Sequence, residues 1–276
     1  MDKAIPPGRT KVVVFDSGLG GLTVLREIAR TRPDLELCLV ADDAAFPYGR
    51  LGDAALTERV VMVLERFIAA LAPSLVVIAC NTASTLALPA LRARFAIPFV
   101  GTVPAVKPAC AQSKTKRISV LATPATVRRD YTRELIREFA SQCRVTLVGS
   151  ERLAGYAEAE LRGEAVADGV IRAEIERCFV DDDGRTDTIV LACTHYPLII
   201  DRLERLATWP VTWLDPGAAI ARRASQLLGP PLPMAGGGGP SRAYFTSGTR
   251  PSAALARTLA DFGIASIEEE HIRVPV

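Results

Sequence analysis

Three short runs of strand-type residues constrain the fold of this chain most strongly. They lie at residues 11–15, 75–79 and 188–192, and they consist almost entirely of apolar side chains. Because apolar and polar residues do not alternate in them, both faces of each strand are expected to be buried. Segments with helical periodicity follow these runs. Continuous apolar strands between helices are typical of a parallel sheet covered on both faces, so the sequence predicts an α/β protein.

The pattern of strands and helices starts twice. The strand expected at 117–122 resembles the first strand, and the strand at 188–192 is then the third of the second half. The two cysteines that follow the third strands are about as far apart in the chain as the two first strands. We therefore predict two similar α/β halves with mainly parallel sheets.

The remaining elements follow from apolar periodicity and turn residues. We expect one helix over about 126–142 and one longer, more polar helical stretch over about 156–179. The other expected elements lie at 22–30, 35–41, 54–71, 84–95, 99–101, 144–148, 211–214, 216–228, 243–246 and 251–262.

Charge and hydropathy exclude several classes of protein. Lys and Arg total 33 against 31 Asp and Glu, a balance that gives no reason to expect nucleic-acid binding. No apolar run reaches the roughly 18 residues of a membrane span. Residues 1–8 lack the apolar core of a secretory leader. We expect a cytoplasmic protein that binds no membrane.

The cysteines argue against a disulfide scaffold and a zinc site. No Cys-x-x-Cys occurs, and His195 and His271 are the only histidines of the sequence. Reduced thiols are the expectation in a cytoplasmic protein, and no metal is expected. The six cysteines are Cys38, Cys80, Cys110, Cys143, Cys178 and Cys193.

Two of these cysteines end apolar strands and open clusters of polar residues. Asn81 and Thr82 follow Cys80, and Thr194 and His195 follow Cys193. The carboxyl ends of strands are where α/β proteins carry their chemistry. A helix N-terminus also lowers the pKa of a thiol, so each sulfur could be poised as a base or an acid. One such cysteine would most simply be a buried core thiol, but two matched ones indicate a pair that faces one ligand.

Two further turns follow the first and second strands. The turn from Asp16 to Thr23 is rich in glycine, but Thr23 stands where the dinucleotide fingerprint needs its third glycine. Its backbone N–H groups favour a small anion such as a carboxylate. Asp16 could cap the helix or lie near the substrate, and we favour the second. Pro47-Tyr48-Gly49 predicts a rigid turn with an exposed phenol at the edge of the crevice.

Several motifs spread along nearly the whole chain carry a resemblance to a known family. They are Phe15-Asp16-Ser17-Gly18-x-Gly20-Gly21-Leu22-Thr23-Val24, Pro47-Tyr48-Gly49, Cys80-Asn81-Thr82-Ala83-Ser84, Thr123-Pro124-Ala125-Thr126, Cys193-Thr194-His195-Tyr196-Pro197-Leu198 and Phe245-Thr246-Ser247-Gly248. Together these motifs resemble those of the cofactor-independent aspartate/glutamate racemases.

The resemblance implies an isomerase, an amino-acid racemase that moves the α-proton of glutamate without pyridoxal phosphate or metal. Cys80 would act on D-glutamate and Cys193 on L-glutamate, with assistance from Asp16 and His195. Glu158, in the more loosely matching segment Leu153-Ala154-Gly155-Tyr156-Ala157-Glu158, would be a further assisting residue. The substrate-binding residues implied are Asp16, Ser17, Tyr48, Gly49, Asn81, Thr82, Thr126, Thr194 and His195.

The resemblance also implies how the chain is organised. The active site would lie in a cleft between two α/β domains, and the end of the chain would return to the first. The expected bounds are 1–104 plus 215–276 for the first domain and 105–214 for the second. A homodimer is expected, and the D-glutamate formed would supply peptidoglycan synthesis.

Other functions stay open at this point. A racemase of the same family could act on aspartate or on a hydantoin, because the contacts that select the side chain are poorly visible in a sequence. A ligand-sensing protein on the same scaffold would not need both thiols. A redox protein is disfavoured by the lack of Cys-x-x-Cys.

Overall fold

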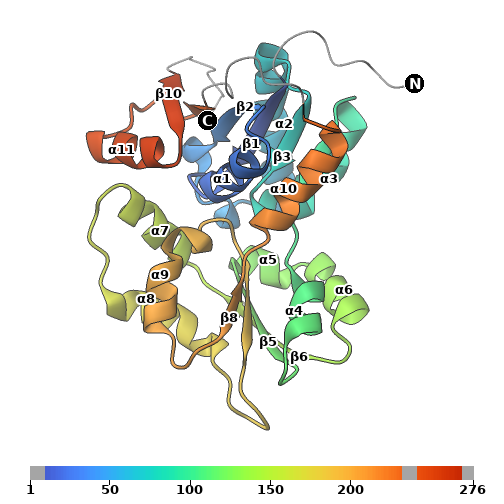
Figure 1. Cartoon of the computed structure of the whole chain (residues 1–276), viewed down its shortest axis with the longest axis vertical. Coiled ribbons are helices and arrows are strands. Elements are labelled where there is room, and N and C mark those ends of the chain that lie inside the picture. The colour runs from blue at the N-terminus through green and yellow to red at the C-terminus, as the bar shows by residue number, and fades with distance from the viewer. Residues whose placement is uncertain (1–9, 232–240, 269–276) are drawn as a thin grey trace.

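The chain folds into two β-sheets, each built of parallel strands and covered by helices on both faces, and the two sheets lie one above the other (Figure 1). The structure, a computed structural model, describes residues 10–231 and 241–268. The first sheet has the order β10-β9-β2-β1-β3-β4 and the second the order β6-β5-β7-β8. The first contains β1 (Lys11–Asp16), β2 (Glu36–Ala41), β3 (Leu75–Ile78), β4 (Phe99–Gly101), β9 (Ser241–Phe245) and β10 (Ile264–Glu268); the second contains β5 (Arg117–Ala122), β6 (Arg144–Gly149), β7 (Thr188–Ala192) and β8 (Thr212–Leu214).

Every pairing between these strands is parallel, which confirms the predicted α/β class. Side chains of a strand alternate between its faces. In β1, Val12 and Val14 pack into one core while Val13 and Phe15 pack into another. The second sheet is likewise buried on both faces. The unbroken apolar runs of the sequence thus have their physical reason in helices that cover both sides.

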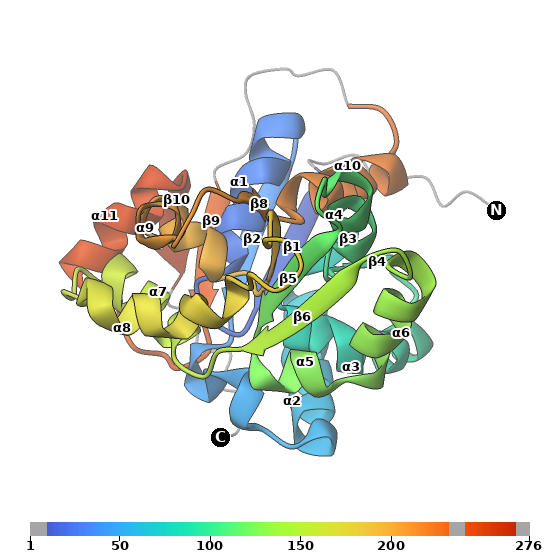
Figure 2. The same ribbon diagram turned by 90° about the horizontal axis from the view of Figure 1, so that it is seen from below.

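The helices divide between the two sheets (Figures 1 and 2). The first sheet is covered by α1 (Gly21–Thr31), α2 (Asp53–Leu71), α3 (Asn81–Arg94), α10 (Gly217–Leu228) and α11 (Ala253–Asp261). The second sheet carries α4 (Val106–Gln112), α5 (Pro124–Arg128), α6 (Asp130–Phe139), α7 (Leu153–Leu161), α8 (Asp168–Ile175) and α9 (Ile200–Leu206). No helix within the described ranges is long and apolar enough to cross a lipid bilayer.

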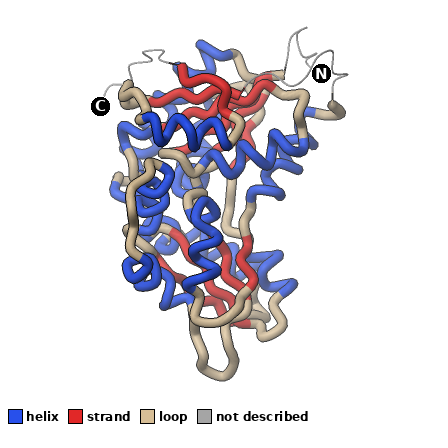
Figure 3. Tube along the Cα trace, turned by 60° about the vertical axis from the view of Figure 1, so that its left-hand side comes forward, coloured by secondary structure: helices blue, strands red, loops and turns tan. Residues whose placement is uncertain are grey.

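The chain passes between the sheets twice, after β4 and again after β8, and its later strands β9 and β10 return to the first sheet (Figure 1). Figure 3 shows the two groups of strands, one above the other, with helices around each. The residue bounds given above for the two domains remain a prediction. The sheets face each other across the ends of β1, β3 and β7, where side chains of both halves are in contact.

Two of the expected helices are broken. The helix expected over 126–142 is divided at Arg129, whose backbone is extended and whose guanidinium pairs with Asp53 of α2. The helical stretch expected over 156–179 consists of α7, α8 and the short 3-10 helix Glu176–Cys178. After α7, Gly163 has a left-handed φ of 81°, a conformation that ends helices and favours glycine.

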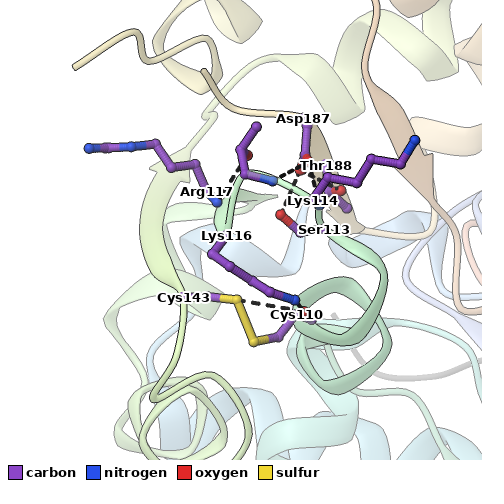
Figure 4. The surroundings of a disulfide bond; sticks show 9 residues. Cys110, Ser113, Lys114, Lys116, Arg117, Cys143, Asp187 and Thr188 are labelled. Carbon is purple, nitrogen blue, oxygen red and sulfur yellow. Dashed lines mark hydrogen bonds between the residues drawn. A yellow bond between two sulfur atoms is a disulfide. The ribbon is translucent and has the colours of Figure 1, made fainter. Parts of the chain in front are cut away.

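The prediction that all six thiols are reduced is wrong for one pair. Cys110 of α4 is bonded to Cys143, which lies just before β6, with a Cα–Cα distance of 6.0 Å (Figure 4). The pair was not predictable, because the two cysteines are 33 positions apart and only the packing of α4 beside the second sheet brings them together. The other four cysteines are free and buried.

Candidate active site

A cavity of about 20 Å³ lies between the two halves of the chain, at the ends of β1, β3 and β7. It is lined by most of the predicted site residues, contributed by both halves. These are Ser17, Tyr48, Gly49, Cys80, Asn81, Thr82, Cys193, Thr194 and His195. Asp16, Thr126 and Glu158 do not line it, and each lies directly behind residues that do.

The two thiols contribute to the same cavity from different halves. Cys80 follows β3 and opens α3, and Cys193 follows β7. Both are 6% exposed. The Cys80 Sγ lies 3.6 Å from Ser17 Oγ, and the Cys193 Sγ lies 3.9 Å from His195 Nδ1. Each sulfur therefore has a different polar neighbour.

Burial determines the protonation of Cys80. Loss of water around the thiol, and then the negative charge of Asp16, raise its pKa to about 12. Hydrogen bonding with the backbone of Ala83 and the side chain of Ser17 opposes this change in pKa and is outweighed. The expectation that a helix N-terminus would lower this pKa is therefore wrong for Cys80, because desolvation is the larger effect. At neutral pH Cys80 carries its proton.

Behind Cys193 lies a buried pair of opposite charges. His195 Nε2 is 2.9 Å from Glu158 Oε1. Burial would lower the pKa of His195, but its hydrogen bonds to Cys193 and Glu158 and the charge of Asp16 raise it well above its usual value. Burial likewise opposes ionisation of Glu158, yet His195 keeps the pKa of that carboxyl below its usual value. Nε2 lies between Glu158 Oε1 and the amide nitrogen of Gly20, which is 3.2 Å away, and Nδ1 on the other side of the ring faces Cys193.

The glycine turn after β1 holds this carboxylate. The amide of Leu19 donates to Glu158 Oε1 at 2.6 Å, so the first half of the chain stabilises a charge of the second. The turn was predicted to favour a small anion; in this structure the carboxylate it holds is the protein's own. A Cβ at Gly20 would lie 2.5 Å from Thr194 Oγ1 and 2.6 Å from His195 Nδ1, which explains the glycine there.

Asp16 is fully buried at the end of β1 and bridges the two halves. Its Oδ2 accepts a hydrogen bond from Thr194 Oγ1 at 2.8 Å, and its Oδ1 accepts from the amide of Gly18 at 3.0 Å. Burial raises the pKa of the carboxyl, and His195, Thr194 and Gly18 only partly offset the effect. When Asp16 is ionised, its negative charge raises the pKa of Cys80. It makes no hydrogen bond to that thiol, because its two oxygens accept from Thr194 and Gly18.

The phenol of Tyr48 is buried rather than exposed. Its hydroxyl donates to Asp42, and Asp42 also forms an ion pair with Arg59 at 2.7 Å. The bonds from Tyr48 and Arg59 to Asp42 could not be predicted from the sequence, because Arg59 lies in α2, 17 positions after Asp42. The network fixes the turn 47–49 against β2, and Tyr48 is one of the residues that line the cavity.

Hydroxyl and amide groups line the side of the cavity near α3 and α5. Thr82 Oγ1 lies 3.2 Å from Thr123 Oγ1 and 3.5 Å from Thr126 Oγ1, so three threonines of two halves meet. The side-chain nitrogen and oxygen of Asn81 are buried and have no hydrogen-bond partner within the described structure. A buried amide without partners is costly unless a ligand satisfies it.

Four lining residues were not among the predicted site residues: Phe46, Pro47, Thr123 and Ala154. The ring of Phe46 lies against His195 with ring centroids 5.2 Å apart. Thr123 could have been found, because it opens the same Thr-x-x-Thr turn that contains Thr126. Phe46 and Ala154 carry no chemical signal in the sequence, since apolar side chains usually fill cores.

The arrangement suits proton transfer in a site without bulk water. A protonated thiol comes from one half, and a thiol beside an imidazolium comes from the other. A cavity of about 20 Å³ holds roughly one water molecule, so the described conformation is closed and must open to admit any organic ligand. Exclusion of water strengthens the electrostatic interactions within such a site.

The chain is similar to known proteins in both sequence and fold. The family model described as Asp/Glu/Hydantoin racemase matches residues 19–224. Glutamate racemase of Rhizobium meliloti (strain 1021) is 54% identical over 92% of each chain, and that of Brucella canis is 50% identical over 92% of each chain. A crystal structure of Escherichia coli glutamate racemase, in complex with L-glutamate and the activator UDP-MurNAc-ala, superposes with a TM-score of 0.87. It is 39% identical and covers 95% of this chain and 98% of that one.

Proposed function

Because this chain belongs to the Asp/Glu/hydantoin racemase family, we propose that it is a glutamate racemase that uses the thiols of Cys80 and Cys193. The single observation that supports this mechanism best is the position of the two thiols, which come from opposite halves and line one closed cavity. The substrate, glutamate, is inferred from the relatives named above, which are glutamate racemases.

In the L-to-D direction, the thiolate of Cys193 removes the α-proton of L-glutamate. The C–H bond breaks as the S–H bond of Cys193 forms. The carbanion-like state then takes the proton of Cys80 on its opposite face, which leaves Cys80 as the thiolate. The D-to-L direction reverses these steps, with Cys80 as the base. The raised pKa of Cys80 supports this assignment, because it keeps a proton on the sulfur that must give one.

The neighbours of each thiol have separate roles. The imidazolium of His195, held by Glu158, stabilises the thiolate of Cys193 across the 3.9 Å contact. We assign Glu158 as a positioning residue, because it acts through His195. Asp16 holds Thr194 in place and keeps the proton on Cys80, and Ser17 hydrogen-bonds the sulfur.

The polar side chains that line the cavity are the best candidates to bind substrate. The amide of Asn81 and the hydroxyls of Thr82, Thr123 and Thr194 can bind the carboxylates and the amino group. Ser17 and Gly49 border the same space. Thr126 supports Thr82, and the hydroxyl of Tyr48 is already bonded to Asp42.

Replacement of each thiol tests the mechanism. Cys80→Ser and Cys193→Ser should each lower the racemisation rate by about a thousandfold or more, since each removes an acid or base. Circular dichroism of glutamate measures the rate. Cys178→Ala is the matched control, because Cys178 is a free, buried cysteine outside the cavity. Wild-type turnover by either serine variant would overturn the two-thiol mechanism.

Two measurements separate this function from its alternatives. In heavy water, a racemase places deuterium on the α-carbon of the D-glutamate that it forms, whereas a ligand-binding protein exchanges none. Rates on L-glutamate and L-aspartate, measured side by side, decide the substrate. Faster turnover of aspartate would refute the proposed substrate while leaving the two thiols in place.

The setting of the reaction belongs to the same proposal. We propose that the enzyme is cytoplasmic, acts as a homodimer and supplies D-glutamate to peptidoglycan synthesis. Cell fractionation tests the location, and light scattering on the purified chain tests the dimer. Depletion of the protein should be rescued by D-glutamate in the medium if the supply role is right.

A further inference from the structure

A second cavity, of about 390 Å³, adjoins the closed one. The two share Pro47, Gly49, Thr123 and Ala154 as lining residues, so they meet at these positions. The second cavity is nearly twenty times larger and is open to solvent along its charged residues. It is therefore the space through which a ligand can approach the thiols when the two halves separate.

The charges around this outer cavity are mainly positive. Its lining contains three arginines, Arg50, Arg128 and Arg152, against one carboxylate, Glu151. Arg152 lies 3.5 Å from Glu174, which partly neutralises it. Arg50 and Arg128 are exposed, and neither guanidinium has a hydrogen bond or an ion pair within the part of the chain that the structure describes.

The two unpaired arginines come from opposite halves. Arg50 ends the 3-10 helix Tyr48–Arg50, next to the Tyr48 and Gly49 of the inner cavity. Arg128 ends α5, the helix that opens beside Thr123. The neighbour Arg129 pairs with Asp53 across the two halves, so α5 is anchored at the rim and Arg128 is left for another partner.

We propose that this outer cavity is the entrance to the active site, and that Arg50 and Arg128 attract the carboxylates of the substrate there. The inference rests on the proposed function, because an acidic amino acid is the ligand that this charge would select. Unpaired charges at the mouth of a low-dielectric cleft raise the local concentration of an oppositely charged ligand. Their effect is long-ranged at low ionic strength and is screened by salt.

The double variant Arg50→Gln/Arg128→Gln tests the proposal. At an ionic strength of about 20 mM its kcat/KM for glutamate should fall about three- to tenfold, with kcat within about twofold of wild type. Near 0.5 M salt the difference should disappear, because the screening length is then only a few ångströms. Charge reversal in Arg50→Glu/Arg128→Glu should enlarge the loss at low salt.

The matched control is Arg222→Gln/Arg223→Gln. These neighbouring exposed arginines line a different cavity and give the same change in net charge. An equal fall in both double variants, or no fall in the first, would overturn the proposal. A test that does not need turnover is the dissociation constant of glutarate, measured by isothermal titration calorimetry, which should rise by the same factor in the first variant and stay unchanged in the control. Wild-type protein that fails to racemise glutamate would instead refute the function.

Discussion

The 2.9 Å contact between His195 Nε2 and Glu158 Oε1 joins two buried side chains whose charges depend on each other. Both belong to the second half of the chain, yet the amide of Leu19 in the first half also binds the carboxylate. The pair is therefore complete only when the two halves are closed. The protonation of His195 is in this way coupled to the conformation that excludes water from Cys193.

Glu158→Gln should change how activity depends on pH. The raised pKa of His195 means that its imidazolium persists at low pH and is lost as the pH rises through that pKa. Without the charge of Glu158 this pKa falls, so the alkaline limb of kcat/KM moves to lower pH. We expect a loss of about ten- to hundredfold at pH 9 and a smaller loss at pH 6.

The control for that variant is Glu160→Gln on the same helix, where the carboxylate pairs with Arg202 and not with the site. It should keep the wild-type pH profile. If Glu158→Gln lowers kcat/KM by one factor at every pH, Glu158 does not tune His195.

Gly20→Ala should impair closure of the two halves. The added Cβ would lie 2.5 Å from Thr194 Oγ1, so the turn after β1 and the residues after β7 must move apart. We expect kcat/KM to fall about a hundredfold, because small displacements of reacting groups are costly. Gly169→Ala is the comparison, since its Cβ would meet nothing within 4 Å and α8 should gain about 0.5–1 kcal/mol. Wild-type activity in Gly20→Ala would contradict this role.

Asp42→Ala should destabilise the first half of the chain. Asp42 is fully buried and binds Arg59, Tyr48 and Thr246. Removal of the carboxylate breaks its ion pair with Arg59, whose side chain is 11% exposed, at a cost of about 3–5 kcal/mol in the free energy of unfolding. Urea denaturation measures it. Glu65→Gln, in the half-exposed pair with Arg94, should change stability by less than about 1 kcal/mol.

The disulfide should contribute to stability in the absence of reductant. The bond closes a loop of 33 residues, for which the chain-entropy relation gives about 3–4 kcal/mol. Cys110→Ser/Cys143→Ser should lose that amount, and reductant should then have no further effect. Thiol titration of the unfolded, unreduced protein should detect four of the six cysteines. Detection of all six would show that the bond does not form.

Much of the fold was predictable because its cause is local. The unbroken apolar runs of β1, β3 and β7 reflect burial on both faces, which is visible residue by residue. The short helices α4 and α9 were missed, since seven residues give too few turns for a clear period. The breaks at Arg129 and Gly163 depend on an ion pair across the halves and on a positive φ.

The site was predictable to the extent that its residues are chemically distinctive. Cys80 and Cys193 could be identified from their residue type and from their position at strand ends. The pKa of Cys80 could not be predicted, because it depends on burial and on Asp16, which is distant in the sequence. The hydrogen bond from the glycine turn to Glu158 could not be predicted either, since Leu19 and Glu158 are 139 residues apart.

The small volume of the inner cavity has a consequence for the durability of the protein. At 6% exposure, both thiols are shielded from dissolved oxidants as well as from water. The opening that admits an amino acid also admits hydrogen peroxide, which attacks the thiolate form. The rate of inactivation by peroxide should therefore report how often the resting molecule opens. The closed resting conformation protects both thiols from oxidation.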